Sequence, residues 1–250
     1  MLLRWRDNPS VASSGNPPVE SRHSAGSAAL VALRQVAKVY RDGGVRALDD
    51  VSLEIPEGQF VSIVGPSGCG KSTLLHVMGA LDVPTAGEVL FRGVPLAAIA
   101  DLDRLRSREI GFVFQTFYLL PNLTAQENVQ VPMFGDGRSD AERVARADEL
   151  LALVGLESRS GHLPSQLSIG QRQRVAIARA LANAPSLILA DEPTGSLDSR
   201  SGGEVMDLLG RLHAEHGTAL VVVTHDAAVA ARAERTIRML DGRVVADGPP

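Results

Sequence analysis

A glycine-rich run in the first half of the chain ends in a lysine and a hydroxyl side chain. The run is Gly65-Pro66-Ser67-Gly68-Cys69-Gly70-Lys71-Ser72, and it fits the pattern G-x-x-x-x-G-K-[ST] of a phosphate-binding loop. Glycines let backbone N–H groups turn inward toward an anion, and the positive end of a helix that begins there also favours phosphate. Lys71 would add a positive charge beside the β- and γ-phosphates of a nucleotide. The Ser72 hydroxyl suits Mg²⁺, which prefers oxygen ligands.

The residues on both sides of this run supply the structural context that such a loop requires. Residues 59–64 form an apolar segment typical of a short buried strand, and residues 72–78 have the spacing of a helix with Leu74, Leu75 and Met78 facing a core. Strand, glycine loop and helix in this order favour a nucleotide site. The alternative is a chance glycine-rich turn.

Two acidic residues follow an apolar segment much later in the chain. Residues 187–190 are all apolar, as expected for a strand of a parallel sheet that is covered on both faces, and Asp191 and Glu192 come next. Ligand sites of α/β proteins lie at this end of the strands. Asp191 could hold Mg²⁺ directly or through water, and Glu192 could orient and polarise an attacking water molecule. The alternative is a pair of solvated loop acids.

Four other residues at the ends of predicted elements could contribute to the same site. Tyr40 precedes a turn and could stack on an adenine ring, or it could be an ordinary residue at the rim of a sheet. Gln115 ends an apolar strand and could bind Mg²⁺ through its carbonyl oxygen, or it could be solvated. His225 ends another apolar strand and could contact a γ-phosphate, whereas the other histidines are expected to be structural. Ser168 is a natural N-cap, so its helix is either an anion site or an ordinary capped helix.

The surrounding pattern predicts an α/β domain preceded by a tail. Residues 1–29 are rich in Ser, Gly, Pro and Ala and predict a disordered tail, with a partner-binding arm as the alternative. The domain is expected to cover residues 30–250, with a mainly helical insertion at about residues 96–180 that includes Val144, Ala147, Leu151 and Val154 at helical spacing. We predict further strands at residues 30–40, 47–55, 88–91, 111–115 and 219–224, a helix at residues 201–216 and a closing hairpin around residues 241–242.

Composition excludes several classes of protein. The chain has 250 residues, of which 44% are hydrophobic and 22% charged, and a formal net charge of −4, so it shows no basic footprint for nucleic acid. No apolar run approaches the roughly 20 residues that span a bilayer, so work at a membrane would need another chain. Cys69 is the single cysteine, which excludes an internal disulfide and is compatible with the cytoplasm.

The order of these motifs resembles that of ABC-type ATPases, and the resemblance covers residues 30–248. The motifs are Tyr40, the glycine loop, Gln115, Ser168-Ile169-Gly170-Gln171, Leu189-Ala190-Asp191-Glu192, Ser196-Leu197-Asp198 and His225. At a finer level, segments such as Gly111-Phe112-Val113-Phe114-Gln115 and Ala190-Asp191-Glu192-Pro193-Thr194-Gly195 resemble ATP-binding subunits of the macrolide-export and lipoprotein-release group. The resemblance implies a P-loop NTPase (RecA-like) core with an antiparallel β subdomain and an inserted α-helical subdomain.

The resemblance also implies a mechanism in which two copies pack head to tail and enclose two ATP molecules with Mg²⁺. Residues implied to bind nucleotide in one copy are Tyr40, Gly65, Pro66, Ser67, Gly68, Cys69, Gly70, Lys71, Ser72, Thr73 and Gln115; Ser168, Gly170, Gln171 and Asp198 would act across the interface. Ser72, Gln115 and Asp191 would serve the metal, and Glu192 and His225 would be catalytic. ATP would close the dimer, and the helical insertion would pass the motion to a polytopic membrane permease, which places the protein on the cytoplasmic face of the membrane.

The signature stretch departs from the family pattern Leu-Ser-Gly-Gly-Gln at one position, because Ile169 replaces the first glycine. A β-branched side chain could crowd the dimer interface, or its backbone angle could be unsuited to isoleucine, and either would weaken ATP-driven dimerisation. Cys69 lies near Lys71 and a helix N-terminus, which could lower its thiol pKa and make it reactive unless MgATP protects it. The alternative is a small residue in a variable position of the loop.

Three functions compete with transport. An ABC ATPase could signal through a membrane partner, as the similar cell-division ATPases do. A soluble ABC ATPase of DNA repair, chromosome structure or translation is disfavoured, because Gln115 and Ser168 are only 168 − 115 = 53 positions apart, with no room for a long coiled coil, and because the chain holds a single ATPase unit. A P-loop kinase would leave the stretch from Ser168 to Gln171 unexplained.

Overall fold

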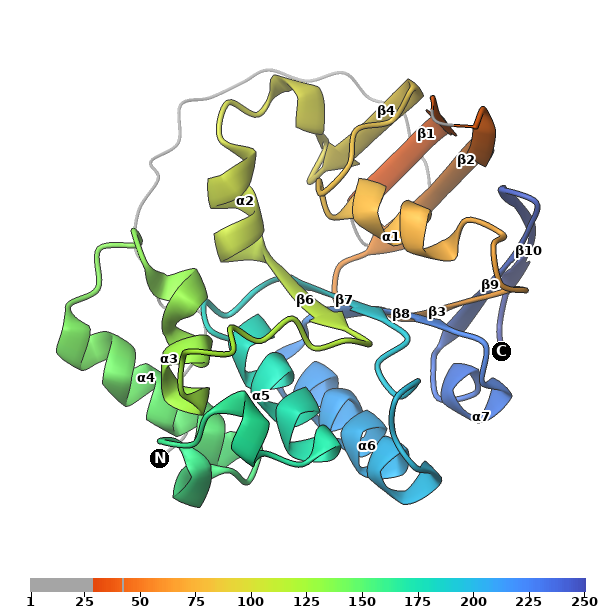
Figure 1. The fold of residues 1–250 in the computed structure, drawn as a ribbon. Coiled ribbons are helices and arrows are strands. Elements are labelled where there is room, and N and C mark those ends of the chain that lie inside the picture. The colour runs from red at the N-terminus through yellow and green to blue at the C-terminus, as the bar shows by residue number, and fades with distance from the viewer. Residues whose placement is uncertain (1–28, 42) are drawn as a thin grey trace.

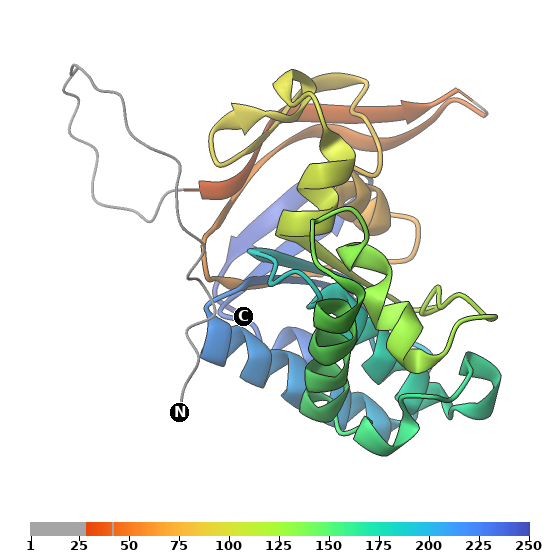
Figure 2. The ribbon, with the colours of Figure 1, turned by 90° about the vertical axis from the view of Figure 1, so that its left-hand side faces the viewer.

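The computed structural model describes residues 29–41 and 43–250, which form two sheets and a layer of helices (Figures 1 and 2). The smaller sheet is antiparallel, with the order β2-β1-β4-β5. Its strands are β1 (Ala29–Tyr40), β2 (Val45–Pro56), β4 (Ala86–Phe91) and β5 (Val94–Pro95). The expected tail falls outside the described residues except for Ala29, so its disorder stays a prediction.

The larger sheet is mainly parallel and has the order β10-β9-β3-β8-β7-β6. Strands β6, β7, β8, β3 and β9 pair in parallel, and β10 returns antiparallel as the predicted hairpin. The strands are β3 (Phe60–Val64), β6 (Ile110–Phe114), β7 (Leu187–Asp191), β8 (Ala219–Thr224), β9 (Arg235–Leu240) and β10 (Arg243–Gly248). The carboxyl ends of β3, β6, β7 and β8 therefore meet at one edge, where the candidate residues follow them.

The described residues contain seven α-helices. They are α1 (Lys71–Met78), α2 (Leu102–Glu109), α3 (Ala125–Gln130), α4 (Asp140–Leu153), α5 (Ile169–Ala180), α6 (Ser199–His216) and α7 (Ala227–Ala230), with short 3-10 turns at Leu96–Ala98, Val131–Met133, Glu157–Arg159 and Pro164–Gln166. Figure 1 shows α1 between the two sheets, whereas α3, α4, α5 and α6 lie on the opposite side of the parallel sheet.

Two hydrophobic cores lie on opposite faces of the parallel sheet. Along β7, Leu187 and Leu189 belong to the core shared with α1 and the antiparallel sheet, whereas Ile188 and Ala190 belong to the core shared with α3–α6. A strand that is buried on both faces explains why its sequence is apolar without alternation. The predicted helical face is confirmed at Ala147, Leu151 and Val154, but Val144 is 38% exposed, because the first turns of α4 project beyond the core.

The predicted fold class is confirmed, with its antiparallel sheet, parallel core and helical layer. The insertion at residues 96–180 includes β6, so the helical layer proper begins after residue 115 and ends with α5. None of the helices in the described part of the chain is long and apolar enough to cross a membrane.

Candidate active site

The glycine loop joins β3 to α1, as predicted, and its glycines allow close packing. A side chain on Gly70, whose φ is 99°, would place its Cβ 2.2 Å from the Ala47 carbonyl oxygen, and a Cβ on Gly65 would lie 2.3 Å from the Met239 carbonyl oxygen. The loop is thus pressed against β2 and β9, while Pro66, Ser67 and Gly68 remain exposed. This arrangement leaves the outer backbone of the loop open to a ligand.

Lys71 is the first residue of α1 and is only 8% exposed. Its ammonium group donates to the carbonyl oxygens of Gly65, at 2.8 Å, and Pro66, at 3.0 Å. The charge is therefore held inside the loop, next to the N-terminal N–H groups of α1. A phosphate placed there would meet a cation and the positive end of a helix together.

Cys69 is buried in the core, with its sulfur 4.0 Å from the Lys71 Nζ. Its side chain lies below the loop, where a Cβ on Gly65 would come within 2.7 Å of it. Burial limits the access of reagents and favours the packing role over the reactive one. Inactivation that MgATP blocks stays a prediction for this thiol.

The predicted acidic cluster is brought to the glycine loop by the parallel pairing of β7 with β8 and of β8 with β3. The Ser72 hydroxyl donates to Asp191 Oδ1 at 3.1 Å. Glu192 follows with φ at 47°, a left-handed conformation that is strained for glutamate. Its N–H donates to the Val223 carbonyl oxygen of β8 at 3.0 Å, which fixes the turn at the end of β7.

His225 lies beside Glu192, with 2.9 Å between His225 Nδ1 and Glu192 Oε1. The hydrogen bond to Glu192 and the charge of that carboxylate raise the pKa of His225. The histidine side chain is 71% exposed, whereas the Glu192 side chain is 18% exposed. The pair thus joins the ends of β7 and β8 and leaves the imidazole accessible to a ligand over the loop.

Gln115 follows β6 and is positioned by residues that sequence reasoning did not assign to the site. A Cβ on Gly195 would lie 2.8 Å from Gln115 Nε2. The Ser196 hydroxyl donates to the backbone carbonyl oxygen of Gln115 at 3.3 Å. The turn after Glu192 therefore supports the glutamine from one side. In the sequence, Gly195 stands out only as part of the family-like segment after Glu192, because a contact between positions so far apart leaves no trace in one sequence.

The donors near Ser72 fit a magnesium ion that is shared with a nucleotide. Ser72, Gln115 and Asp191 offer a hydroxyl, an amide oxygen and a carboxylate, all of them oxygen ligands of the kind Mg²⁺ prefers. In the part of the chain that the structure describes, no three His, Cys, Asp or Glu side chains form a metal cage. With a single carboxylate in the set, the ion would depend on phosphate oxygens and water for its remaining ligands.

The signature residues form a second site with different lining residues. Ser168 caps α5, with the Gln171 N–H donating to Ser168 Oγ at 3.2 Å and Gln171 Oε1 accepting from the Ser168 N–H at 2.9 Å. A hollow of about 240 Å³ is lined by Gly155, Leu156, Ser168, Gly170, Gln171, Arg174, Ser201, Glu204 and Val205. The Gln171 side chain is engaged in the cap, so its prediction as a nucleotide contact depends on a rearrangement or on its backbone.

Asp198 is hydrogen-bonded to Ser201, which is one of the residues lining this hollow. It caps α6 by accepting from the Ser201 N–H at 3.0 Å and from the Ser201 hydroxyl at 2.8 Å, and these hydrogen bonds lower the pKa of Asp198. A Cβ on Gly170 would lie 3.8 Å from Ser201, so nothing in this chain requires glycine at that position. A half-buried glycine that its own chain does not require fits the close approach of a ligand held by another chain.

Ile169 is the first residue of α5 and is 45% exposed. It is absent from the described residues with positive φ, so the expectation of an unsuitable backbone angle is wrong. A helical N1 position accepts isoleucine without strain. Only the crowding of a partner remains as a route to weaker dimerisation.

A chain with these features is a P-loop nucleotide-binding protein with a signature helix. The family model for "ABC transporter" matches residues 48–195. A protein from Thermotoga maritima described as an uncharacterized ABC transporter ATP-binding protein is 52% identical over 219 residues, which cover 86% of this chain and 93% of the relative.

Solved structures give the same result. The cassette MJ0796, solved as a dimer in a post-hydrolysis state bound to ADP and Pi, is 49% identical, has a TM-score of 0.81 and covers 88% of this chain and 98% of its own. The protein cbiO1 from Clostridium perfringens, part of the ABC transporter complex cbiONQ, is 29% identical with a TM-score of 0.80, and 90% of each chain is covered. The chain belongs to the family of ABC transporter ATP-binding proteins and is an ATPase.

Proposed function

We propose that the chain is the ATP-hydrolysing subunit of a membrane transporter and that it works as a head-to-tail dimer. The observation that carries this proposal is the division of the site into two parts. In one part, Ser72 of the glycine loop is hydrogen-bonded to Asp191, and the neighbouring Glu192 is bonded to His225. Ser168 and Gly170 line a separate hollow. A second copy related by a two-fold axis would bring each part against its complement.

Each residue would have a defined part in hydrolysis. Lys71 and the loop N–H groups would hold the β- and γ-phosphates, and Ser72, Gln115 and Asp191 would hold Mg²⁺, which when bound neutralises phosphate charge. Glu192 would orient a water molecule and take its proton as the oxygen attacks the γ-phosphorus and the bond to the β-phosphate oxygen breaks. The partner's signature helix would present its N-terminus and a Ser168 hydroxyl to the same phosphate.

The bonds of Glu192 and Lys71 support a mechanism in which ATP closes the dimer. Glu192 is bonded to His225, and Lys71 to loop carbonyls, so both side chains have partners within the same chain. A bound γ-phosphate would compete for His225 and Lys71 and would free Glu192 for water. Nucleotide binding is therefore expected to reorganise the site before turnover, and the dimer would open again after phosphate release.

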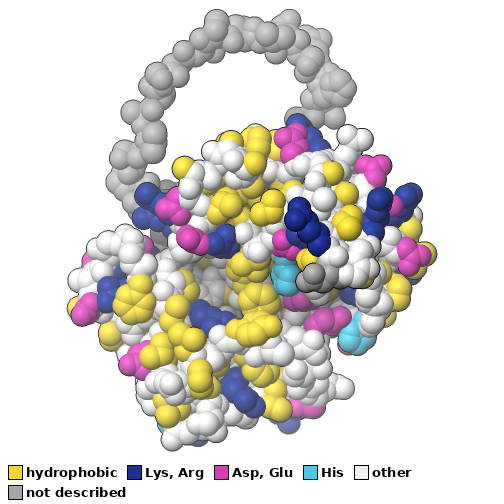
Figure 3. All heavy atoms as spheres, turned by 45° about the horizontal axis from the view of Figure 1, so that its top comes forward, with side chains coloured by type: hydrophobic (Ala, Val, Ile, Leu, Met, Phe, Trp, Pro, Cys, Tyr) yellow, Lys and Arg dark blue, Asp and Glu magenta, His cyan; other side chains and the backbone are white. Residues whose placement is uncertain are grey.

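The helical layer offers apolar side chains for a membrane partner. Tyr118, Leu120 and Phe134 are 65%, 45% and 61% exposed, and they lie on the segments that follow β6 and α3. Figure 3 shows hydrophobic side chains gathered across the middle of one face, between charged groups. A polytopic permease at the cytoplasmic face of the membrane would cover such a surface, and substrate selection would lie in that permease.

The finer assignment is to a system that exports or extracts its substrate, like the macrolide-export and lipoprotein-release group. It is supported by the motif segments around Gln115 and Asp191. The second candidate is an ABC ATPase that signals through a membrane partner, as cell-division ATPases do. It uses the same exposed surface, so the identity of the partner separates the two.

The variant Glu192→Gln tests the proposal. It is expected to bind MgATP and to form a stable dimer while turnover falls by at least about 100-fold, since the general base is lost. Tagged protein purified with MgATP from gently solubilised native membranes would be expected to carry a polytopic permease. Substantial turnover would move the catalytic role elsewhere, and copurification of ribosomes or DNA without a membrane chain would overturn the transport function.

A further inference from the structure

The ring of Tyr40 is held in place by two charged side chains, Lys38 and Asp82. Tyr40 ends β1 and is 37% exposed. Its hydroxyl donates to Asp82 Oδ2 at 2.9 Å. The Lys38 ammonium lies 5.0 Å from the ring centroid and forms an ion pair with Asp82. The ring is thus fixed at its edge by a hydrogen bond and on one face by a cation.

Lys38 is itself held, so it cannot easily leave the ring. Its Nζ donates to the Val83 carbonyl oxygen at 2.8 Å, and its side chain is only 12% exposed. Because Lys38 covers one face of the Tyr40 ring, a base can stack only on the opposite face. Residues two apart on a strand point to the same side, which is why β1 brings the lysine to the tyrosine.

Asp82 also connects this ring to the helix of the glycine loop. The Asp82 N–H donates to the His76 carbonyl oxygen of α1 at 3.2 Å. A second contact joins β1 to the segment after α1, because the Thr85 hydroxyl accepts from the Val39 N–H at 3.0 Å. Burial raises the pKa of Asp82, but hydrogen bonds from Lys38, Tyr40 and the Val83 N–H outweigh it, so the net pKa is lowered. The carboxylate therefore stays ionised at neutral pH.

We propose that Asp82, with Lys38, is a positioning residue that sets the Tyr40 ring for the adenine base and so determines how much the base adds to nucleotide affinity. The proposal rests on the proposed function, in which ATP binds at the glycine loop, and on the stacking of adenine on Tyr40 that the resemblance to ABC-type ATPases implies. It predicts that the contributions of the phosphates and of the base can be separated by substitution. Asp82 lies beyond the far end of α1, so its loss would leave the N-terminal turn and Lys71 unchanged.

The test compares binding of ATP with binding of inorganic tripolyphosphate, both with Mg²⁺, to the full chain. Asp82→Ala and Tyr40→Ala are each expected to weaken ATP binding about tenfold, with tripolyphosphate affinity within about twofold of the parent. In the double variant the two losses are expected not to add, because both substitutions remove the same base contact. Asp82→Asn keeps an acceptor for the Tyr40 hydroxyl and should recover part of the affinity. Glu88→Gln is the matched control, because Glu88 forms an exposed ion pair with Arg34 in the same sheet.

Each outcome decides between the inference and the proposed function. Normal ATP affinity in Asp82→Ala, with a loss in Tyr40→Ala, would overturn the inference alone. Equal losses for ATP and tripolyphosphate would also overturn it, because the residue would then act through the phosphates. A parent chain that binds neither ligand would overturn the nucleotide site itself. If Asp82→Ala does not fold, Tyr40→Phe removes only the hydroxyl and is expected to weaken ATP binding about threefold; unchanged affinity would contradict the proposal.

Discussion

The chain enters the helical layer between β6 and α3 and leaves it between α5 and β7, and the two crossings are built differently. In the entry crossing, residues 115–124, Phe117 and Tyr118 have φ at 63° and 44°. A left-handed conformation costs an ordinary residue about 1–2 kcal/mol. Arg179 of α5 holds this backbone, with Nη1 2.5 Å from the Tyr118 carbonyl oxygen and Nη2 2.6 Å from that of Phe117.

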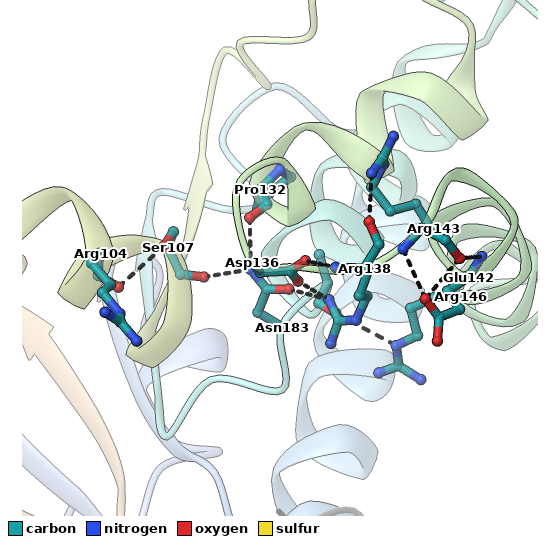
Figure 4. Close-up of polar contacts among 11 residues, drawn as sticks. Arg104, Ser107, Pro132, Asp136, Arg138, Glu142, Arg143, Arg146 and Asn183 are labelled. Atoms are coloured by element: carbon teal, nitrogen blue, oxygen red, sulfur yellow. Dashed lines mark hydrogen bonds and ion pairs between the residues drawn. The ribbon is translucent and has the colours of Figure 1, made fainter.

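The exit crossing, residues 181–186, is anchored on both sides by one amide side chain (Figure 4). Asn183 Nδ2 donates to the carbonyl oxygens of Ser107, at 2.8 Å, and Pro132, at 2.7 Å, while its Oδ1 accepts from Arg138 at 2.6 Å. Ser107 belongs to α2 beside the core, whereas Pro132 and Arg138 belong to the helical layer. The left-handed residue in this crossing is the small Ala184, with φ at 55°.

The difference assigns different mechanical roles to the two crossings. Further along the entry crossing, the buried Asn128 amide bonds the backbone of Leu120 and Leu123. The strained turn at Phe117 and Tyr118, whose carbonyl groups are held by one guanidinium, has a low-energy alternative once that contact is lost. An amide whose donors and acceptor are all used resists displacement, because each lost partner leaves a polar group unsatisfied. We expect the helical layer to pivot at Asn183 and to move at the entry crossing, which begins with Gln115, a proposed metal ligand, and carries the exposed Tyr118.

The largest effect is expected from Asn183→Asp, which keeps the size of the side chain but removes both N–H donors. A carboxylate would then face the carbonyl oxygens of Ser107 and Pro132. The free energy of unfolding should fall by about 2 kcal/mol, since two hydrogen bonds are lost and two acceptors lose their donor. Denaturant unfolding measures this loss. Asn122→Asp is the control, because Asn122 is exposed; equal losses in the two variants would mean that Asn183 is no anchor.

A smaller and more local effect is expected from Arg179→Lys. Burial lowers the pKa of Arg179, and a lysine ammonium is more strongly hydrated and lacks the planar fork that reaches two carbonyl groups. The Phe117 amide donates to the carbonyl oxygen of Phe114, the last residue of β6, and the Tyr118 amide donates to that of Thr116. Their hydrogen exchange should therefore become about tenfold faster, while the exit crossing keeps its protection.

The control for this exchange experiment is Arg200→Lys, because the Arg200 side chain is 89% exposed and pairs only with Glu204 among the contacts that the structure describes. It should leave exchange at both crossings unchanged. If Arg179→Lys sped exchange equally at both crossings, the helical layer would be loosening as a whole, and the distinction between a moving crossing and a pivot would fail.

Residue types and spacing were enough to predict the strand ends that carry the candidate site, but not the contacts that hold its residues in place. The glycine loop, Asp191, Glu192 and the strand before each of them follow from local pattern, because apolar runs and glycine spacing are properties of short segments. The left-handed conformations of Glu192, Phe117 and Tyr118 are imposed by tertiary contacts against the preference of each residue.

The partners of the site residues were beyond sequence reasoning for the same reason. Asp82 is 42 positions from Tyr40, and Arg179 is 61 positions from Tyr118, so their contacts exist only once the sheets and helices have packed. Ile169 shows the converse case. Its family position suggested a special backbone, whereas an ordinary helical turn, capped by Ser168, accepts it.

The smallest effect is expected from relieving left-handed strain. Ala184→Gly relieves it in the exit crossing, and Phe117→Gly relieves it in the entry crossing. Glycine adopts this conformation freely but loses more entropy on folding, so Ala184→Gly should stabilise the protein by only about 0.5 kcal/mol. Phe117→Gly also loses the contact of the ring with the Arg172 guanidinium, 5.5 Å from the ring centroid, and its net change in stability should be near zero. Turnover separates the two variants: it should be unchanged in Ala184→Gly and altered severalfold in Phe117→Gly, because only the entry crossing carries Gln115. A change in turnover of the same size in both would show that the exit crossing moves as well.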